Sequence, residues 1–145
     1  MAEDVKFYGM KGVYGCFSNF YPAGFTLRDR QWPTVEHFFQ AMKFEGSEYA
    51  DAIRTAANPT KAKRLGKSRA HPIRPDWSEV RYPLMLEALR AKFTQHEPLR
   101  QVLLSTGSAH LAEHTARDKI WGDGGNGSGQ NLLGKALMQV RGELV

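Results

Sequence analysis

Hydrophobic and polar positions follow two different patterns along the chain. Between residues 5 and 31, aromatic side chains are scattered among glycines and a proline, which is typical of short strands and turns. Within that region, the segment GFTLRDRQWP at 24–33 predicts a β-hairpin. From Thr34 onward, apolar residues recur every three to four positions, which indicates helices. The whole pattern predicts a mainly α fold: one compact helical domain over residues 1–145, with a small β element near the N-terminus.

Helix start signals divide the first part of the helical region into three segments. Thr34 and Ser47 are good N-caps for the first two helices. Asn58 followed by Pro59 predicts the start of a third helix, which we expect to end at Gly66. The second helix is expected to turn three apolar residues towards the core: Ala50, Ile53 and Ala57.

Three more helices are predicted towards the C-terminus. Asp76 opens a D-x-x-E capping pattern ahead of a long helix, in which Pro83 should cause a kink or a split into two helices. Another helix is expected over 97–107, whereas residues 109–120 are ambiguous between strand and helix. Asn131 is expected to cap the last helix.

Composition narrows the class of protein. Hydrophobic residues make up 41% of the 145 residues and charged residues 24%, values that suit a globular domain with its own core. No apolar run approaches the length of a membrane span, and the start of the chain does not resemble a secretory signal. A lone cysteine, Cys16, excludes an internal disulfide and is best interpreted as a packing residue. We therefore expect a reducing, cytoplasmic location.

The chain is basic, with a net charge of +5 and a pI of about 9.5. This balance favours anionic partners such as phosphorylated metabolites, nucleotides or nucleic acid, although a solvated positive face explains it equally well. Basic residues cluster over 61–69, as either a solvated helix face or a phosphate clamp. Other basic residues could hold a phosphate as well: Arg81, Arg90, Lys92 and Arg141.

The segment WPTVEHFFQAMKF at 32–44 places one carboxylate among aromatic residues at a predicted helix start. Glu36, Gln40 and Lys43 fall on one face of that helix, so they line either a pocket or a wet surface. The positive end of the helix dipole should keep Glu36 ionised, which fits a base or a cation stabiliser better than an acid.

The stretch WGDGGNGSGQ at 121–130 is dense in glycine and precedes the last helix. Such a loop lets backbone amides approach an anion closely, and a helix N-terminus is a natural phosphate site. Trp121 could stack on a base, and Asp123 could bind ribose hydroxyls or act as an acid–base group. A plain connector, with Trp121 as its anchor and Asp123 making a turn, is an equally open interpretation.

The histidines offer a rival site. The segment HLAEH at 110–114 matches H-x-x-E-H, a zinc-protease motif in which two histidines one helical turn apart share a metal. The motif is short, the segment is not clearly helical, and no third ligand is evident. We therefore expect no metal site.

Six stretches taken together resemble one family, the NADAR family, and within it the YbiA-like riboflavin-biosynthesis-intermediate N-glycosidases. They follow in order: FSNFYP (17–22), WPTVEHFFQAMKF (32–44), NPTKAKRLGK (58–67), LMLEALRAKF (84–93), LLSTG (103–107) and WGDGGNGSGQNLLGKALMQVR (121–141). The resemblance implies a mainly helical domain. It also implies hydrolysis of the C–N bond between ribose 5-phosphate and the amino-pyrimidine of early riboflavin intermediates. Two alternatives stay open, an ADP-ribosyl-guanine hydrolase acting on ADP-ribosylated DNA and a non-catalytic ADP-ribose or nucleotide-binding module.

The resemblance also implies a set of site residues. The implied catalytic residues are Glu36 and Asp123, and the implied substrate-binding residues are Lys43, Trp121, Gly122 and Asn131. Glu36 would stabilise positive charge on the anomeric carbon, as in glycosidases, while Asp123 would assist the leaving group or hold the ribose. The expected partner is a phosphorylated ribosyl small molecule or, alternatively, ADP-ribosylated nucleic acid. The scheme requires no cofactor, metal or membrane, and it leaves the oligomeric state open.

Overall fold

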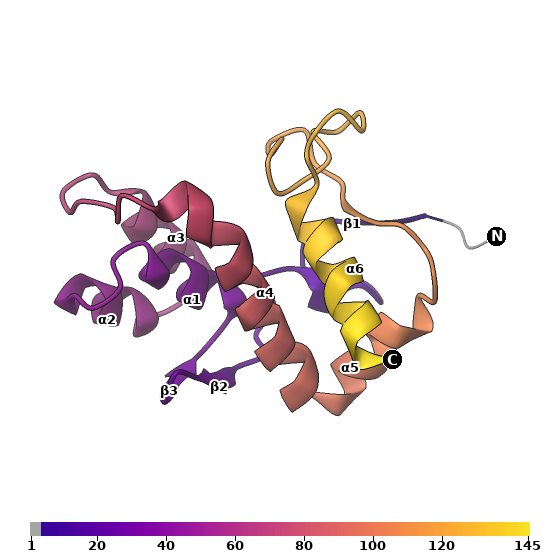
Figure 1. Cartoon of the computed structure of the whole chain (residues 1–145), viewed down its shortest axis with the longest axis horizontal. Coiled ribbons are helices and arrows are strands. Elements are labelled where there is room, and N and C mark those ends of the chain that lie inside the picture. The colour runs from indigo at the N-terminus through magenta and orange to yellow at the C-terminus, as the bar shows by residue number, and fades with distance from the viewer. Residues whose placement is uncertain (1–3) are drawn as a thin grey trace. The chain divides into compact units, whose positions relative to one another are not determined.

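The structure, a computed structural model, describes residues 4–145 and is mainly helical, as predicted (Figure 1). It divides into two compact units. The terminal unit comprises residues 4–18 and Phe93–Val145, and the central unit comprises Asn19–Lys92. The unit boundary falls inside the last turns of α4 (Trp77–Gln95).

Three helices pack against one another in the central unit: α1 (Val35–Met42), α2 (Glu48–Arg54) and α3 (Pro59–Lys67). Each starts at its predicted cap. The side chains of Thr34, Ser47 and Asn58 each accept a hydrogen bond from the backbone amide three residues further on. These contacts satisfy amides that have no partner inside the helix, which explains why the N-termini could be predicted locally.

Two predicted details of the central helices are wrong. Ala57 is exposed and Ala56 is buried instead, because α2 ends at Arg54 and its periodicity does not extend further. Gly66 does not end α3, which continues to Lys67. It is a buried position inside the helix, where α3 approaches α1.

The predicted hairpin is confirmed. Strand β2 (Phe25–Leu27) pairs antiparallel with β3 (Arg30–Trp32). The two turn residues, Arg28 and Asp29, have φ angles of 54° and 61°, a left-handed conformation that glycine adopts more easily. Arg28 forms salt bridges with Glu45 and Glu87 that hold this turn.

Helix α4 is continuous through Pro83, so of the two expected effects, a kink or a split, the split does not occur. Its core face is formed by Met85, Leu89 and Phe93, which are almost fully buried. Burial of this apolar face offsets the one backbone hydrogen bond that a proline inside a helix removes. Lys92 is fully buried on the same helix, with its ammonium 5.8 Å from the centre of the Tyr21 ring.

The terminal unit contains the second β element. Strand β1 (Val5–Phe7) pairs in parallel with β4 (Leu111–Glu113), so the ambiguous segment 109–120 contains a strand and β structure is not confined to the N-terminal region. Helices α5 (Glu97–Ser105) and α6 (Leu132–Leu144) contact each other, and α6 packs on β4. Gly134 allows this packing, because a Cβ there would lie 2.1 Å from the Leu111 carbonyl oxygen.

The core of the terminal unit is aromatic and apolar. Phe17 contacts Phe7 and Phe93 with ring centroids 5.5 and 6.2 Å apart, and Cys16 is buried beside it, as a packing residue should be. Arg141 is also buried and donates to the Thr106 hydroxyl and the Ala109 carbonyl, so it serves the fold. Among residues 4–145, no helix is both long and apolar enough to cross a bilayer.

Candidate active site

Glu36 lies in the first turn of α1 and is not a surface charge. Only 7% of the Glu36 surface is exposed, and Gln40 Nε2 donates a 2.7 Å hydrogen bond to Glu36 Oε2. The i to i+4 spacing predicted that these two side chains would share a face, and the structure shows them in contact. A buried carboxylate held by a neighbouring amide is typical of a functional acid.

The pKa of Glu36 is shifted by the packing around it, in the direction opposite to the effect expected of the helix dipole. Burial raises the pKa of Glu36 above its ordinary value, and this effect outweighs the hydrogen bond from Gln40 and the charges of Lys63, Lys43 and Lys67, which lower it. A carboxyl group with a raised pKa can give and take a proton closer to neutral pH.

Lys43 follows at the C-terminal end of α1 and is partly buried. Its Nζ donates to the Gly66 carbonyl oxygen of α3 at 3.3 Å and lies 5.9 Å from the centre of the Trp77 ring. Burial lowers the pKa of Lys43, and Arg69 and Lys67 lower it further, whereas Glu36 raises it. The structure thus brings Glu36 and Lys43 together in the central unit, as the sequence predicted.

The close approach of α3 to α1 was missed by sequence reasoning. A Cβ added to Gly66 would lie 2.0 Å from Gln40 Oε1 and 2.8 Å from Gln40 Cβ, so only glycine fits. The signal was available, because a glycine inside a helical pattern often marks close packing. The absence of a side chain at Gly66 therefore leaves room for Gln40 to reach Glu36.

The neighbouring residue His37 is structural. Its Nε2 donates to the Ala56 carbonyl at 3.0 Å, and its Nδ1 lies 2.8 Å from the Thr34 hydroxyl. Burial lowers the pKa of His37, although the bond to Ala56 opposes this. With both ring nitrogens in hydrogen bonds, the His37 imidazole stabilises the first turn of α1, and that turn positions Glu36.

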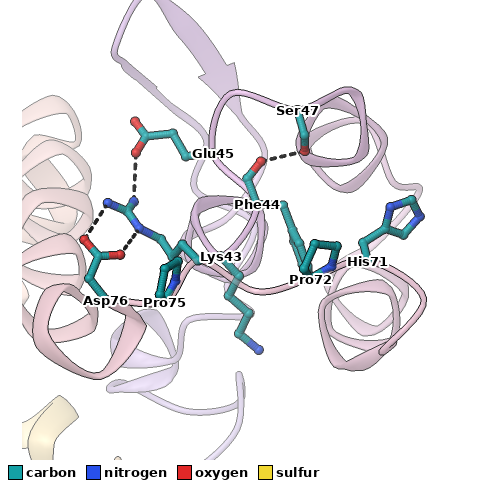
Figure 2. A pocket seen from close by; sticks show the side chains of 9 residues that line it. Lys43, Phe44, Glu45, Ser47, His71, Pro72, Pro75 and Asp76 are labelled. Carbon is teal, nitrogen blue, oxygen red and sulfur yellow. Dashed lines mark hydrogen bonds and ion pairs between the residues drawn. The ribbon is translucent and has the colours of Figure 1, made fainter.

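Lys43 also borders a pocket of about 540 Å³ in the central unit. Figure 2 shows Glu45 and Asp76 on one side of this pocket and His71 on the other, with Lys43 between them. Salt bridges of 2.8 and 2.7 Å tie Arg74 to Glu45 and Asp76. The carboxylate of Asp76 is thus bound to a guanidinium at the start of α4. Sequence reasoning did not identify this pocket, because its lining comes from separate segments of the chain.

The other predicted site residues lie in the terminal unit. Asp123 Oδ1 accepts from the amides of Thr115 and Gly125 at 3.1 and 2.8 Å, and Oδ2 accepts from His114 Nδ1 at 2.8 Å. Burial alone would raise the pKa of Asp123, but the His114 hydrogen bond and the two amides lower it by more. Asp123 is therefore held as a carboxylate, which does not fit a proton donor.

His114 belongs to this carboxylate and not to a helical metal motif. Strand β4 separates His110 from His114, and four residues of strand span about 13 Å, too far for two ligands of one metal. Among residues 4–145 no group of metal-ligating side chains is found. The His114 side chain is 47% exposed while that of Asp123 is 8% exposed, so the imidazole remains accessible at the surface.

The glycine loop is held by hydrogen bonds between backbone and side-chain groups that are close together in the chain. Backbone amides expected to face an anion donate instead to acceptors in the same segment: those of Gly124, Gly125, Ser128, Gly129, Gln130, Asn131, Leu132 and Leu133. The acceptors include the carbonyls of Asp118, Lys119 and Ile120. These amides are therefore not free to bind a phosphate in this conformation of the loop.

Asn131 and Gly122 build the loop. Asn131 stands at the N-cap of α6 in a left-handed conformation with φ of 53°, but its side chain makes no capping bond. It accepts from the Glu113 amide and donates to the Leu111 carbonyl, which ties the loop to β4. Gly122 is buried where a Cβ would lie 2.7 Å from Thr115 Cγ2, and the Trp121 amide donates to Asp118 Oδ1. The predicted capping role of Asn131 is thus corrected to a tertiary one.

Comparison with known proteins gives a consistent result. The profile of the NADAR domain matches residues 6–145. N-glycosidase YbiA of Escherichia coli is 46% identical over 140 residues, covering 97% of this chain and 88% of that protein. A riboflavin biosynthesis protein of Vibrio vulnificus, VVA0006, is 39% identical over 144 residues, covering 99% of this chain and 39% of that protein. The NMR structure of E. coli YbiA matches with a TM-score of 0.91 and 45% identity, over 99% of this chain and 86% of that one.

Proposed function

The chain belongs to the NADAR family, and from this we propose that it is an N-glycosidase that hydrolyses a ribosyl C–N bond in early riboflavin-biosynthesis intermediates. The observation that carries the proposal is the buried Glu36 carboxyl group with its Gln40 hydrogen bond. The riboflavin-related name of the Vibrio relative supports the substrate class. The expected cytoplasmic location belongs to the same proposal.

The reaction needs a group that tolerates developing positive charge. As the C1′–N bond breaks, its electron pair leaves with the amino-pyrimidine, and positive charge grows on C1′ and the ring oxygen. The Glu36 carboxylate stabilises that charge. A water oxygen then bonds to C1′, and the proton it loses passes through Glu36 to the departing amine. The products are the free amino-pyrimidine and ribose 5-phosphate.

Two features of the site suit Glu36 to this role. Gln40 fixes Oε2 at 2.7 Å, which orients the other oxygen, Oε1, for a water molecule. Burial raises the pKa of Glu36, so the carboxylate is a stronger base than an exposed glutamate. We keep Trp121 as the proposed stacking partner of the base, with Gly122 and Asn131 shaping its loop. Asp123, held ionised, is proposed to act as a hydrogen-bond acceptor.

The test compares two glutamates that each lie in the first turn of a helix. Glu36→Gln removes the acid from the first turn of α1, and Glu48→Gln removes an exposed acid from the first turn of α2. Release of ribose 5-phosphate from the ribosylamino-pyrimidine phosphate is followed by chromatography. We expect Glu36→Gln to lose about 10²–10⁴-fold in kcat, the usual worth of a positioned acid–base group, and Glu48→Gln to match wild type. Equal rates for wild type and Glu36→Gln would refute the role of Glu36.

The same assay separates the alternative substrates. An oligonucleotide carrying ADP-ribosylated guanine is offered in parallel, and release of free ADP-ribose is measured. Hydrolysis of the oligonucleotide alone, with strong loss of binding at higher salt, would favour the nucleic-acid enzyme. Binding of ADP-ribose without turnover of either substrate would favour the non-catalytic module.

A further inference from the structure

Basic side chains are concentrated in one segment of the central unit. Residues 55–75 contain no Asp or Glu and carry these basic side chains: Lys61, Lys63, Arg64, Lys67, Arg69 and Arg74. The salt bridges described in this unit use Arg28, Arg54 and Arg74, and none of them involves Lys63 or Lys67. The charge of these two lysines is therefore available to an anion from outside.

The packing of α3 directs this charge to one place. Lys63 and Lys67 stand one helical turn apart and flank Gly66, the residue in closest contact with Gln40 of α1. The Gly66 carbonyl also accepts from Lys43 Nζ at 3.3 Å. Lys61 lies roughly 160° around the helix from Lys63 and roughly 120° from Lys67, at about 100° per residue, and all three lysines are exposed.

Charge interactions support the same placement. Lys63, Lys43 and Lys67 are the three cations whose charges lower the pKa of Glu36. Lys67 and Arg69 in turn lower the pKa of Lys43, which means that these cations also act on one another. Three ammonium groups thus interact with a single buried carboxylate, so their total positive charge is larger than its negative charge.

Other parts of the chain are poorer candidates for an anion. In the glycine loop, the amides of Gly124, Gly125, Ser128 and Gly129 already donate to acceptors nearby in the chain. Arg141 is buried and bound to Thr106 and Ala109, and Lys92 is fully buried. Arg74 is neutralised by two carboxylates.

We propose that Lys63 and Lys67 of α3, together with Lys43 of α1, form the subsite that holds the phosphate of the ribosyl substrate beside Glu36. This inference rests on the proposed function and adds to it the residues that select a phosphorylated substrate. A phosphate accepts charge-assisted hydrogen bonds from ammonium groups, and binding there carries the ribose to the catalytic carboxylate. The sugar without its phosphate lacks this anchor.

The experiment measures binding directly, without turnover. Ribose 5-phosphate, inorganic phosphate and ribose are titrated into wild type, Lys63→Ala, Lys67→Ala and Lys61→Ala by calorimetry at low ionic strength. Lys61→Ala is the matched control, since it removes the same charge from another face of α3. Lys67→Arg tests whether a cation alone is sufficient. Melting curves confirm that each variant is folded.

We expect Lys63→Ala and Lys67→Ala each to weaken ribose 5-phosphate binding at least tenfold, and Lys61→Ala to stay within twofold of wild type. Lys67→Arg should retain most of the affinity, and ribose binding should be equally weak in all proteins. Equal losses for Lys61→Ala and Lys67→Ala would overturn the subsite, because they would show only a general effect of net charge. Unchanged affinity in both Lys63→Ala and Lys67→Ala would overturn it as well.

Failure of the subsite and failure of the proposed function give different results. If wild type binds ribose 5-phosphate through Lys63 and Lys67 but cleaves no ribosylamino-pyrimidine, the reaction is wrong and the subsite stands. If wild type cleaves that substrate and both alanine variants keep its KM, the subsite is wrong and the reaction stands.

Discussion

The contact between Gly66 and Gln40 makes a quantitative prediction about both stability and catalysis. Gly66→Ala adds a methyl group whose carbon would lie 2.0 Å from Gln40 Oε1, 2.7 Å from Cδ and 2.8 Å from Cβ. The amide end of Gln40 can turn away, but its Cβ is fixed to the backbone of α1. The added methyl group must therefore displace the Gln40 side chain from Glu36.

The magnitude follows from three contributions. Overpacking of a buried site costs about 1–3 kcal/mol, and loss of a hydrogen bond to a charged group costs about 1.5–3 kcal/mol. Replacing glycine by alanine inside a helix recovers about 1 kcal/mol. The net loss for Gly66→Ala is therefore about 1.5–5 kcal/mol, which lowers the melting temperature by at least about 3 °C in a chain of this size.

Catalysis should change in a defined direction. The hydrogen bond from Gln40 lowers the pKa of Glu36, so its loss raises that pKa further above the ordinary value. If turnover needs the Glu36 carboxylate, the acid limb of the kcat/KM profile moves to higher pH in Gly66→Ala. A pH series from about 5 to 9 on the purified variant measures this shift.

Gly142→Ala is the control for Gly66→Ala. Gly142 lies in α6, and no heavy atom lies within 4 Å of the position that an alanine methyl group would occupy there. Alanine at this position should therefore stabilise the protein by about 1 kcal/mol through helix propensity alone. An equal gain in stability for Gly66→Ala, with an unchanged pH profile, would refute the close packing and the role of Gln40.

Three further predictions concern stability. Because burial raises the pKa of Glu36, ionising it opposes folding as pH rises above its ordinary pKa, so Glu36→Gln should melt above wild type at about pH 8 and equal it towards about pH 4. The pKa of Asp123 is lowered on balance, so its hydrogen bond from His114 stabilises the fold above the ordinary pKa of an aspartate and is lost in strong acid. Asp123→Asn should therefore lower the melting temperature at neutral pH. The difference from wild type should shrink as the solution is acidified. Asp29→Gly should raise the melting temperature by about 1–4 °C, since glycine accepts the φ of 61° without strain, and a matched Asp29→Ala variant should not gain.

Much of the helical structure could be predicted from short-range signals. The N-caps Thr34, Ser47 and Asn58 act on amides three residues away, and the hairpin over 24–33 joins strands next to each other in the chain. The position of Glu36 at a helix start was also found this way, whereas its burial stayed open between a pocket and a wet surface. Residues 109–120 could not be assigned to strand or helix, because the partner strand β1 lies about a hundred residues away in the chain.

The glycine loop shows the limit of a motif. Its composition permits an anion cradle, and the same composition permits the self-bound loop that the structure contains. The choice depends on the carbonyls of Asp118, Lys119 and Ile120, which accept the loop amides, and on Asp123, which holds His114 and two more amides. Glycine density alone carries no information about these acceptors.

The amino-acid sequence by itself determined where the helices and the hairpin begin and which carboxylate stands at the start of α1, because those features depend on contacts within a few residues. Tertiary structure decided how that carboxylate behaves. Desolvation by packed side chains raises the pKa of Glu36 by more than the Gln40 hydrogen bond and the lysine charges lower it, and the approach of α3 at Gly66 brings Lys63 and Lys67 towards α1. Both effects come from side chains that meet only after folding, and the strength of an electrostatic interaction depends on the burial that this packing creates.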